Sequence, residues 1–475
     1  MPSQFRSPSP AHPEHAVRNN RRPTYASDPV RGFFHWGARY FDTTNSHAYL
    51  LAGTPDLPDL RRALALASRR FELLGEHQPD APLAVPVDET RISGELSFDN
   101  RVLRAALMDY VAGAATRSRR DPAPRLQLLT SSDSADSCIH LTISHEIADV
   151  KSGNLFMAAV IDEYRKLLAA GTATDDSPAR RYPGQALSSI RPDWYYPSTV
   201  VTRRARAYVD IARRMLTTDR SAVRFAPPAK DASGNDFFHV VLPAELQEGV
   251  RRAARQADVT INTVFSAALV RYIAAHQARP EKRATYSFAL SLRKVFGAAH
   301  DEGFRSYMVP CTLRLSDRAD THALLREVDR RTHALRGGGL ALELGRMENA
   351  VRLYRDGLPT AVVRWVMKRT QGTNIFYSNP GVIEEDFSSF GTPTLPIHGS
   401  LAIGCLVHPY DLMFYTSTFG GRTQLDIVYR RNAFDDIVAR FVTPFLSAVE
   451  RIVADCDRAT AAATPRPAGL AGHGQ

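Results

Sequence analysis

A histidine and an aspartate four residues apart are the side chains of this sequence best suited to catalysis. His145 and Asp149 lie in the segment SHEIADV, residues 144–150. An imidazole has an unperturbed pKa of about 6.5, so a neutral His145 can accept a proton near pH 7. An alcohol is a poor nucleophile until a base withdraws its proton. The residues of this segment therefore indicate a proton acceptor at His145.

The residues around this loop predict a strand before it and a helix after it. Residues 138–144 alternate between apolar and polar, which is typical of a strand with one buried face. Ser152 is suited to cap a helix that Gly171 ends. The apolar residues between them recur at helical spacing: Phe156, Met157, Val160, Ile161, Tyr164, Leu167 and Leu168.

The order of strand, His-x-x-x-Asp and amphipathic helix resembles the signature of the condensation domains of nonribosomal peptide synthetases. It is equally similar to that of the chloramphenicol-acetyltransferase-like acyltransferases, which include wax ester and polyketide-associated enzymes. The family motif is HHxxxDG, and this chain has Ser144 and Val150 where the motif has its first histidine and its glycine. Further matching blocks follow in the family's order, so the resemblance spans about residues 30–455: 259–260, 291–293, 303–304, 309–314, 374–382 and 425–452.

The resemblance implies an α+β fold, an α/β sandwich of two chloramphenicol-acetyltransferase-like lobes that form a V with the active-site channel between them. The expected lobes are residues 28–197 and 236–456, with a basic helix and a linker at 198–235. Residues 1–27 are rich in Pro, Ser, His and Arg, and residues 457–475 have low complexity. Both terminal segments are predicted to be disordered.

The resemblance also assigns roles around the motif. His145 is the general base for an acceptor that attacks a thioester carbonyl, and Asp149 is a structural residue. Asp149 pairs with Arg293, and such a charge-assisted pair can hold the loop in place. Val150 replaces the glycine that lets the donor arm pass closely, which implies a narrower or reshaped channel.

Other candidates for the channel lie in the second half of the sequence. In residues 285–293 a small polar face that ends in Arg293 resembles a channel wall. Ser417, Thr418 or a backbone N–H after Asp149 are candidates for stabilising an oxyanion. The candidates for the acceptor side are Asn374, Tyr307, Tyr377 and His408.

The charge balance and the resemblance together indicate partners. The formal net charge is +10, which suggests an acidic partner such as a carrier protein or a phosphate-bearing cofactor. No nucleic-acid-binding motif accompanies this charge. The resemblance implies no tightly bound cofactor. It implies a phosphopantetheine-linked thioester as donor substrate, on an acyl or peptidyl carrier protein or as acyl-CoA, and a small alcohol or amine as acceptor.

Residues 200–220 predict a basic amphipathic helix. Its apolar side carries Ala205, Tyr208, Ile211, Ala212, Met215 and Leu216. One interpretation is an ordinary helix with a solvated charged face. The other is a dock for an acidic carrier protein through Arg203, Arg206 and Arg213, for CoA phosphates, or for an anionic membrane surface.

Several classes of protein are disfavoured by what the sequence lacks. No apolar run approaches the roughly 18 residues of a membrane span, and the first residues lack the core of a signal peptide, so a cytoplasmic location is expected. The four cysteines are far apart and fit reduced thiols. His145 and Glu146 begin like the zinc motif HExxH, but Asp149 stands where the second histidine belongs, so no metal site is predicted.

Three functions remain open on this evidence. The first is an acyltransferase that forms an ester or an amide in natural-product or lipid biosynthesis. The second is a non-catalytic recruitment domain, which the departures at Ser144 and Val150 allow. The third is a membrane-surface lipid acyltransferase anchored by residues 200–220. The presence of His145, Asp149 and Arg293 together favours the first.

Overall fold

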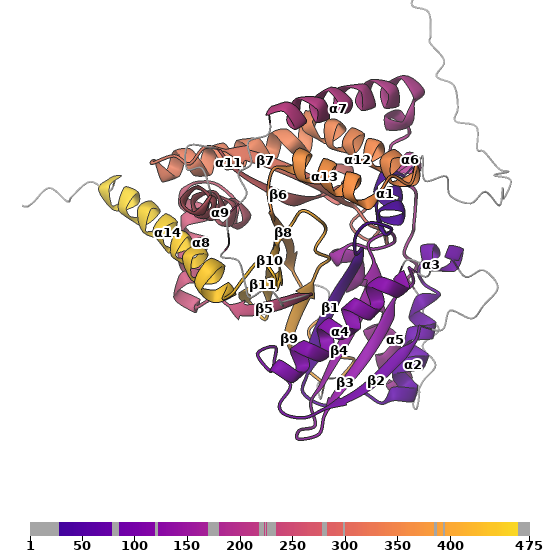
Figure 1. Ribbon diagram of the computed structural model, residues 1–475. Coiled ribbons are helices and arrows are strands. Elements are labelled where there is room, and N and C mark those ends of the chain that lie inside the picture. Colours follow the sequence, from indigo (N-terminus) through magenta and orange to yellow (C-terminus); the bar gives the residue numbers. More distant parts are fainter. Residues whose placement is uncertain are drawn as a thin grey trace, which may run out of the picture.

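The computed structural model describes residues 28–77, 85–118, 122–169, 180–217, 223, 225, 234–277, 283–297, 300–383, 387–392 and 395–463. These residues form two mixed lobes of sheet and helix, the α+β class that the sequence predicts (Figure 1). The predicted disordered segment 1–27 lies outside the described residues.

The first sheet has five strands in the order β2-β3-β4-β1-β9. Its strands are β1 (Thr44–Leu51), β2 (Val87–Ile92), β3 (Arg125–Ser131), β4 (Ser137–Ser144) and β9 (Ile397–Ile403). Successive side chains of β4 face opposite ways, so Ile139 packs with α2 (Leu57–Ser68) and α5 (Val150–Ala169), while Cys138 packs with α4 (Arg101–Ser118). β1 pairs antiparallel with β4 and places Thr44 opposite Ser144, where the His145 loop begins.

The second sheet has six strands in the order β5-β11-β10-β8-β6-β7. These are β5 (Asn235–Val241), β6 (Ala284–Ser291), β7 (Met308–Leu315), β8 (Ile375–Val382), β10 (Leu412–Phe419) and β11 (Arg422–Arg430). One face packs with α8 (Ala244–Gln256), α9 (Ile261–His276), α11 (Thr321–Ala334) and α14 (Thr443–Ala463). β9 lies in the second half of the sequence but pairs with β1, so it ties the two lobes together.

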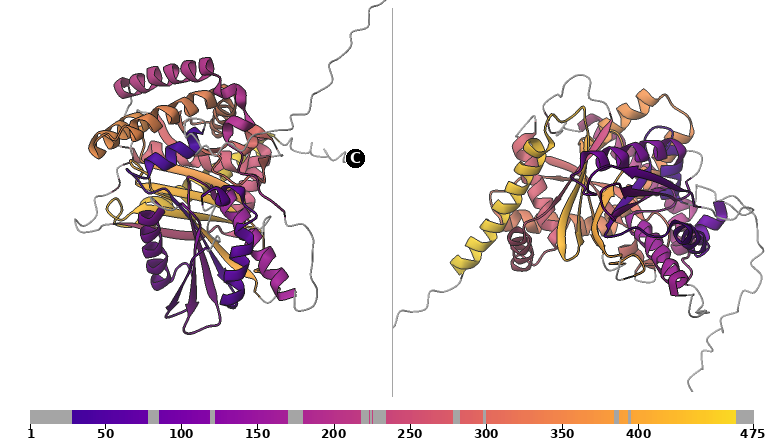
Figure 2. Two further views of the ribbon diagram at one scale, coloured as in Figure 1. Left: turned by 90° about the vertical axis from the view of Figure 1, so that its right-hand side faces the viewer. Right: turned by 90° about the horizontal axis from the view of Figure 1, so that it is seen from below.

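A layer of helices covers the upper end of the molecule in Figure 1. It contains α1 (Pro29–Gly37), α7 (Pro197–Thr217), α12 (Leu340–Arg355) and α13 (Thr360–Gln371). α12 packs against α1 on one side and α7 on the other, and α7 is outermost in both Figure 1 and Figure 2. The remaining α-helices are the short α3 (Glu72–His77), α6 (Leu187–Ile190) and α10 (Arg293–Phe296).

Two predicted boundaries are corrected by the structure. α5 begins at Val150, and Asp149 Oδ1 accepts a hydrogen bond from the Ser152 backbone N–H at 2.8 Å, so Asp149 and not Ser152 caps this helix. α14 continues to Ala463, so the first part of the predicted disordered tail is helical.

Candidate active site

The loop between β4 and α5 carries the predicted catalytic residue. The His145 backbone N–H donates to the Thr43 carbonyl at 2.7 Å, which fixes the loop against the residue before β1. Ser144, at the position of the motif's first histidine, accepts from the Glu146 N–H through its hydroxyl at 3.1 Å. Ser144 therefore closes the turn that carries His145.

The predicted ion pair between Asp149 and Arg293 is present beneath this loop. Arg293 Nη2 lies 3.0 Å from Asp149 Oδ1, and Asp149 Oδ2 accepts from the Tyr307 N–H at 3.1 Å. Burial raises the pKa of Asp149, but Arg293 and the N–H groups of Ser152 and Tyr307 outweigh burial, so the pKa is below its ordinary value. Asp149 is therefore held as a carboxylate.

Arg293 has a dense set of other partners. Its Nη1 donates to the carbonyls of Gly303, Asp301 and His300 at 2.8, 2.9 and 3.2 Å. Its Nη2 donates to the Ser152 hydroxyl at 2.7 Å, and the guanidinium lies 4.4 Å from the centre of the Tyr307 ring. Since Arg293 comes from the second lobe and Asp149 from the first, this cluster joins the lobes under the His145 loop.

His145 is buried, with 6% of its surface exposed. Its ring stacks on Phe34 of α1, with centroids 4.9 Å apart, and its Nδ1 has no hydrogen-bond partner among the described residues. Burial lowers the pKa of His145 to about 4, although the Asp149 carboxylate and the Ala148 backbone act in the opposite direction. The imidazole is therefore neutral at pH 7.

A cavity of about 150 Å³ adjoins His145. His145, Asp149 and Val150 from the motif line it, together with Ala289 and Ser291 from the predicted channel wall. Most of the other lining residues are apolar or aromatic: Phe33, Phe34, Met308, Pro310, Met367, Phe376, Pro380, Val407, Tyr410, Met413 and Tyr415. The polar residues that sequence reasoning missed are Lys151, Gln371, Ser378 and Asn379.

The other predicted site residues do not line this cavity. Asn374 bonds to the Val223 backbone and to Asp411, so it is a structural residue. Tyr307 donates its backbone N–H to the Asp149 carboxylate. Four more are also absent from the lining: Ser417, Thr418, Tyr377 and His408. The strand predicted within residues 374–382 is β8, and its cavity residues are Phe376, Ser378, Asn379 and Pro380.

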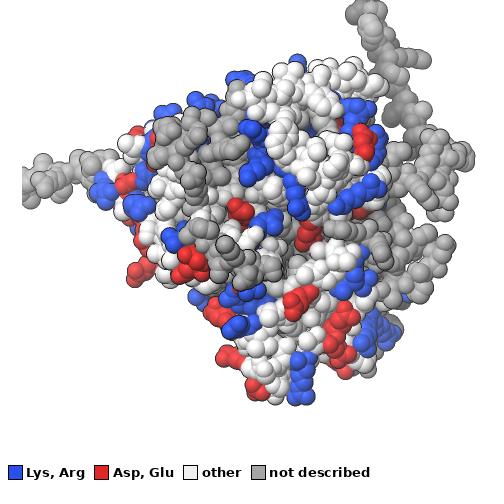
Figure 3. All heavy atoms as spheres, in the orientation of Figure 1, with Lys and Arg blue, Asp and Glu red and all other residues white. Residues whose placement is uncertain are grey.

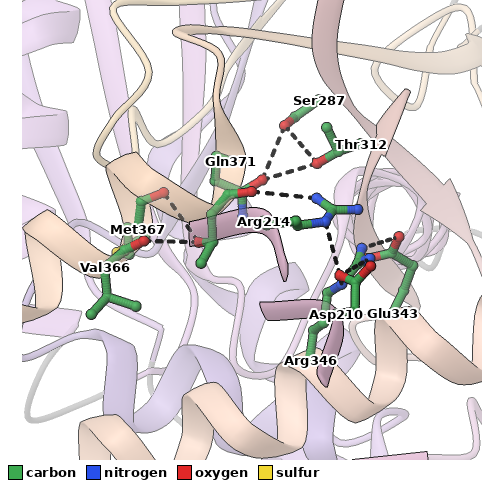
Figure 4. Close-up of polar contacts among 10 residues, drawn as sticks. Asp210, Arg214, Ser287, Thr312, Glu343, Arg346, Val366, Met367 and Gln371 are labelled. Carbon is green, nitrogen blue, oxygen red and sulfur yellow. Dashed lines mark hydrogen bonds and ion pairs between the residues drawn. The ribbon is translucent and has the colours of Figure 1, made fainter. Parts of the chain in front are cut away.

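A second cavity, of about 340 Å³, lies between α7, α12 and α13. Phe33, Pro310, Met367 and Gln371 line both cavities, so they stand at the junction. Figure 4 shows Gln371 there, where its Oε1 accepts from the hydroxyls of Thr312 at 3.0 Å and Ser287 at 3.4 Å. With Oε1 engaged, the Nε2 group is the end of Gln371 that can donate to a bound molecule.

The prediction that Arg203 docks a carrier protein is wrong. Arg203 is 5% exposed, and its guanidinium pairs with Glu348 of α12 and donates to the Trp194 carbonyl at 2.9 Å. Arg206 and Arg213 of the same helix are exposed. The charged side of α7 is thus divided, because Arg203 faces the protein while Arg206 and Arg213 face solvent.

Two kinds of feature are absent from the part of the chain that the structure describes. It contains no group of His, Cys, Asp or Glu side chains that could hold a metal ion. It also contains no helix with the length and apolar character that crossing a membrane requires.

Comparison of the structure with known structures identifies its fold. The condensation domain of the Monacolin K polyketide synthase MokA matches with a TM-score of 0.60 and 12% identity, over 90% of this chain and 96% of that chain. Trichothecene 15-O-acetyltransferase from Fusarium sporotrichioides matches with a TM-score of 0.62 and 10% identity, over 90% and 94%. The epimerization domain from the third module of tyrocidine synthetase B matches with a TM-score of 0.59 and 11% identity, over 90% and 96%.

These similarities define the fold of the chain. The chain has the fold shared by condensation domains and chloramphenicol-acetyltransferase-like acyltransferases, with its HxxxD loop between the two lobes. No family model and no curated protein matches the sequence. Since an epimerization domain has the same fold, the reaction must be argued from the site.

Proposed function

We propose that this protein is an acyltransferase that joins an acyl thioester to a hydroxyl or amine acceptor, with His145 as general base. The observation that carries the proposal is a neutral, buried imidazole beside a cavity between the lobes, on a loop clamped by Asp149 and Arg293. The similarity to a condensation domain and an acetyltransferase supports the same reaction class.

The proposed reaction needs one proton acceptor and no redox step. The acceptor O–H or N–H loses its proton to His145 as the oxygen or nitrogen attacks the thioester carbonyl. The tetrahedral intermediate then collapses, the C–S bond breaks, and the imidazolium returns its proton to the leaving thiolate. The products are an ester or an amide and a free thiol.

Burial affects His145 in two opposite ways. It keeps the imidazole neutral and able to accept a proton, but it also makes the imidazolium costly. The Asp149 carboxylate offsets part of this cost, since its charge raises the pKa of His145. Asp149 thereby supports the base electrostatically as well as capping α5.

The start of α5 is the best candidate for stabilising the developing oxyanion. Val150 lines the cavity and occupies the first position of this helix, whose first N–H groups have no partner within the helix. A helix N-terminus favours negative charge. We assign this role to a backbone N–H after Asp149, in place of Ser417 and Thr418.

The donor is proposed to be a phosphopantetheine-linked thioester, on a carrier protein or as acyl-CoA. The apolar lining of the cavity favours an apolar group next to His145. A cavity of about 150 Å³ lined by apolar side chains can hold a group the size of benzene. Ester or amide formation in natural-product or lipid biosynthesis fits such substrates.

The test is acyl transfer by His145→Ala. Wild-type protein, given a panel of acyl-CoA and acyl-carrier thioesters with alcohols and amines, is expected to yield a product detectable by mass spectrometry. His145→Ala should lower the rate by about 100- to 10,000-fold, because it removes the base. The matched control is His333→Ala, which changes an exposed histidine of α11. A variant that keeps more than about a tenth of the rate would contradict the role of His145.

A further inference from the structure

The outward face of α7 is apolar. Val201, Val209 and Leu216 are 65%, 70% and 87% exposed, and Tyr208 is also exposed. With the exposed Ala205 and Ala212 they form one stripe at helical spacing, since each lies within about 60° of the stripe's centre at 100° per residue. From Val201 to Leu216 this stripe is about 22 Å long.

Charged contacts on the inner face fix this orientation. Arg203 pairs with Glu348, and Arg346 of α12 binds Asp210 of α7 and Glu343, each at 2.5 Å. Figure 4 shows the second group, in which Arg214 also binds Asp210 at 2.9 Å. A Cβ on Gly345 would lie 2.7 Å from the Arg203 carbonyl, so the two helices also approach closely here. α7 therefore cannot turn its apolar stripe inward without breaking these pairs.

The surface continues onto α13, which packs beside α7. Val362 and Trp365 are exposed there, and so are the basic residues Arg364 and Lys368. Figure 3 shows mostly uncharged atoms over the outermost helix, with Lys and Arg near its margins. We name the exposed apolar residues of both helices, with these basic neighbours, the α7/α13 surface.

A groove on the flank of the stripe supplies sites for anions. It has a volume of about 840 Å³ and lies between α7 and the start of α12. Arg206 and Arg213 line it with three hydroxyl side chains, Ser198, Thr199 and Thr202. Guanidinium and hydroxyl groups bind phosphate oxygens well. Among the described residues that line this groove, Asp210 is the acidic one. Arg214 and Arg346 already neutralise it.

We infer that the α7/α13 surface binds an anionic lipid bilayer, with the apolar stripe in the acyl boundary and the groove at the lipid headgroups. Interfacial helices combine an apolar face with flanking cations, and Trp and Tyr favour the membrane interface. Large aliphatic side chains are exposed along α7. They match the apolar interior of a bilayer better than they match the polar surface of a small protein partner. This inference does not rest on the proposed acyl transfer.

The second cavity gives the surface a link to His145. Tyr208 and Ile211 of α7 and Val366 and Thr370 of α13 line it, and it adjoins the His145 cavity at Gln371. A lipid-borne acceptor or donor would thus pass from the bilayer toward the catalytic loop between α7, α12 and α13.

The experiment is co-sedimentation of the full chain with vesicles of phosphatidylcholine, alone or with phosphatidylglycerol. Wild-type protein is expected to bind the anionic vesicles, more weakly at high salt because the Debye length falls from about 10 Å at 0.1 M to about 3 Å at 1 M. The double variant Val209→Glu, Leu216→Glu should lower the partition coefficient at least about tenfold, since it places charge in the acyl boundary. Val102→Glu, at an exposed apolar residue of α4 in the other lobe, is the matched control and should bind like wild type.

Further variants separate the possible outcomes. Glu favours helices more than Val does and about as much as Leu does, so the double variant should melt like wild type. If its melting temperature is lower, the single variant Val201→Glu is tested in its place. Wild type that stays in solution with both vesicles, or a double variant that binds equally, overturns the inference. So does salt-sensitive binding of an acidic carrier protein without vesicle binding, which would make this a protein dock. His145→Ala should bind vesicles like wild type, so failure of the catalytic proposal is distinguishable.

Discussion

Two buried arginines in this protein make the same kind of bond for different purposes. Arg293 pairs with Asp149 across 144 positions of sequence, and Arg203 pairs with Glu348 across 145. The first pair lies under the His145 loop and joins the two lobes. The second lies between α7 and α12 and decides which face of α7 meets solvent. The presence of a buried arginine therefore does not show what each pair does in the structure. The residues around each pair show it.

The two pairs differ in how many acceptors surround the guanidinium group. Arg293 donates to several backbone carbonyls and to the Ser152 hydroxyl besides Asp149. Arg203 has Glu348 and one carbonyl, that of Trp194. Asp149 in turn accepts hydrogen bonds from the backbone N–H groups of Ser152 and Tyr307. The bond from Ser152 caps α5. More groups lose their partner when the pair at the site is broken, so the two pairs should respond differently to mutation.

The largest effect is expected for Asp149→Ala. It leaves Arg293 buried without its carboxylate and two backbone N–H groups without an acceptor, which should cost about 3–5 kcal/mol of unfolding free energy. It should also abolish acyl transfer, because the His145 loop loses its support. Urea unfolding and rate measurements check both.

The control for this variant is Asp56→Ala. Asp56 also caps a helix, α2, but it is exposed, so its loss should cost about 1 kcal/mol and leave the rate unchanged. Equal losses of stability in the two variants, or the absence of coupling between Asp149→Ala and Arg293→Met in a double-mutant cycle, would contradict the role of the pair.

Arg203→Met should have the next largest effect, and on stability alone. Glu348 would remain buried without a cation, at a cost of about 3 kcal/mol. Transfer from a small soluble thioester should persist at a temperature where the variant is folded, because Arg203 lies outside the His145 cavity. Arg206→Met on the exposed side of the same helix is the matched control and should melt like wild type. Loss of acyl transfer in folded Arg203→Met would show that the Arg203–Glu348 pair also supports the reaction.

Only the first of these two pairs could be predicted from the sequence, for a physical reason. The HxxxD loop, the strand before it and Arg293 form ordered blocks, so the resemblance placed the ion pair and the fold correctly. For α7 the sequence left open which surface its apolar side meets. Glu343, Glu348 and Arg346, which orient this helix, are on α12, more than a hundred residues away, and nothing local to α7 reveals them. The same holds for β8, since only the packing of the strand shows that Asn379 and not the predicted Asn374 lines the cavity.

A smaller effect per group is expected from pH, and it acts on the lobe that contains His145. Burial lowers the pKa of His47 to about 3, of His140 to about 3 and of His145 to about 4. Between pH 6.5 and these values the unfolded chain binds protons that the folded chain does not, so stability is lost as pH falls from 6.5. From pH 6.5 to 5.5 each histidine should remove about 1 kcal/mol.

Unfolding in urea at several pH values checks this prediction. The slope of the unfolding free energy against pH measures how many more protons the unfolded chain binds than the folded chain. His140→Gln should reduce this number by about one, whereas His333→Ala, at an exposed histidine, should leave it unchanged. A stability that is flat between pH 6.5 and 5.5 would mean that these histidines are protonated in the folded state.

The smallest effect is expected at Gln371, which lies where the His145 cavity meets the second cavity. Thr312 and Ser287 occupy its Oε1, so its Nε2 is the group that can donate to a substrate. Gln371→Leu should raise KM for the substrate that passes this point by about 2- to 10-fold, the value of one hydrogen bond, with little change in kcat. Gln371→Glu separates the two ends of the amide, because a carboxylate keeps the acceptor for Thr312 and Ser287 but lacks the donor. If Gln371→Glu matches the KM of wild type, Gln371 only braces β6 and β7 against α13. If it fails like Gln371→Leu, the amide N–H binds substrate, and the substrate whose KM rises is the one that enters between α7, α12 and α13.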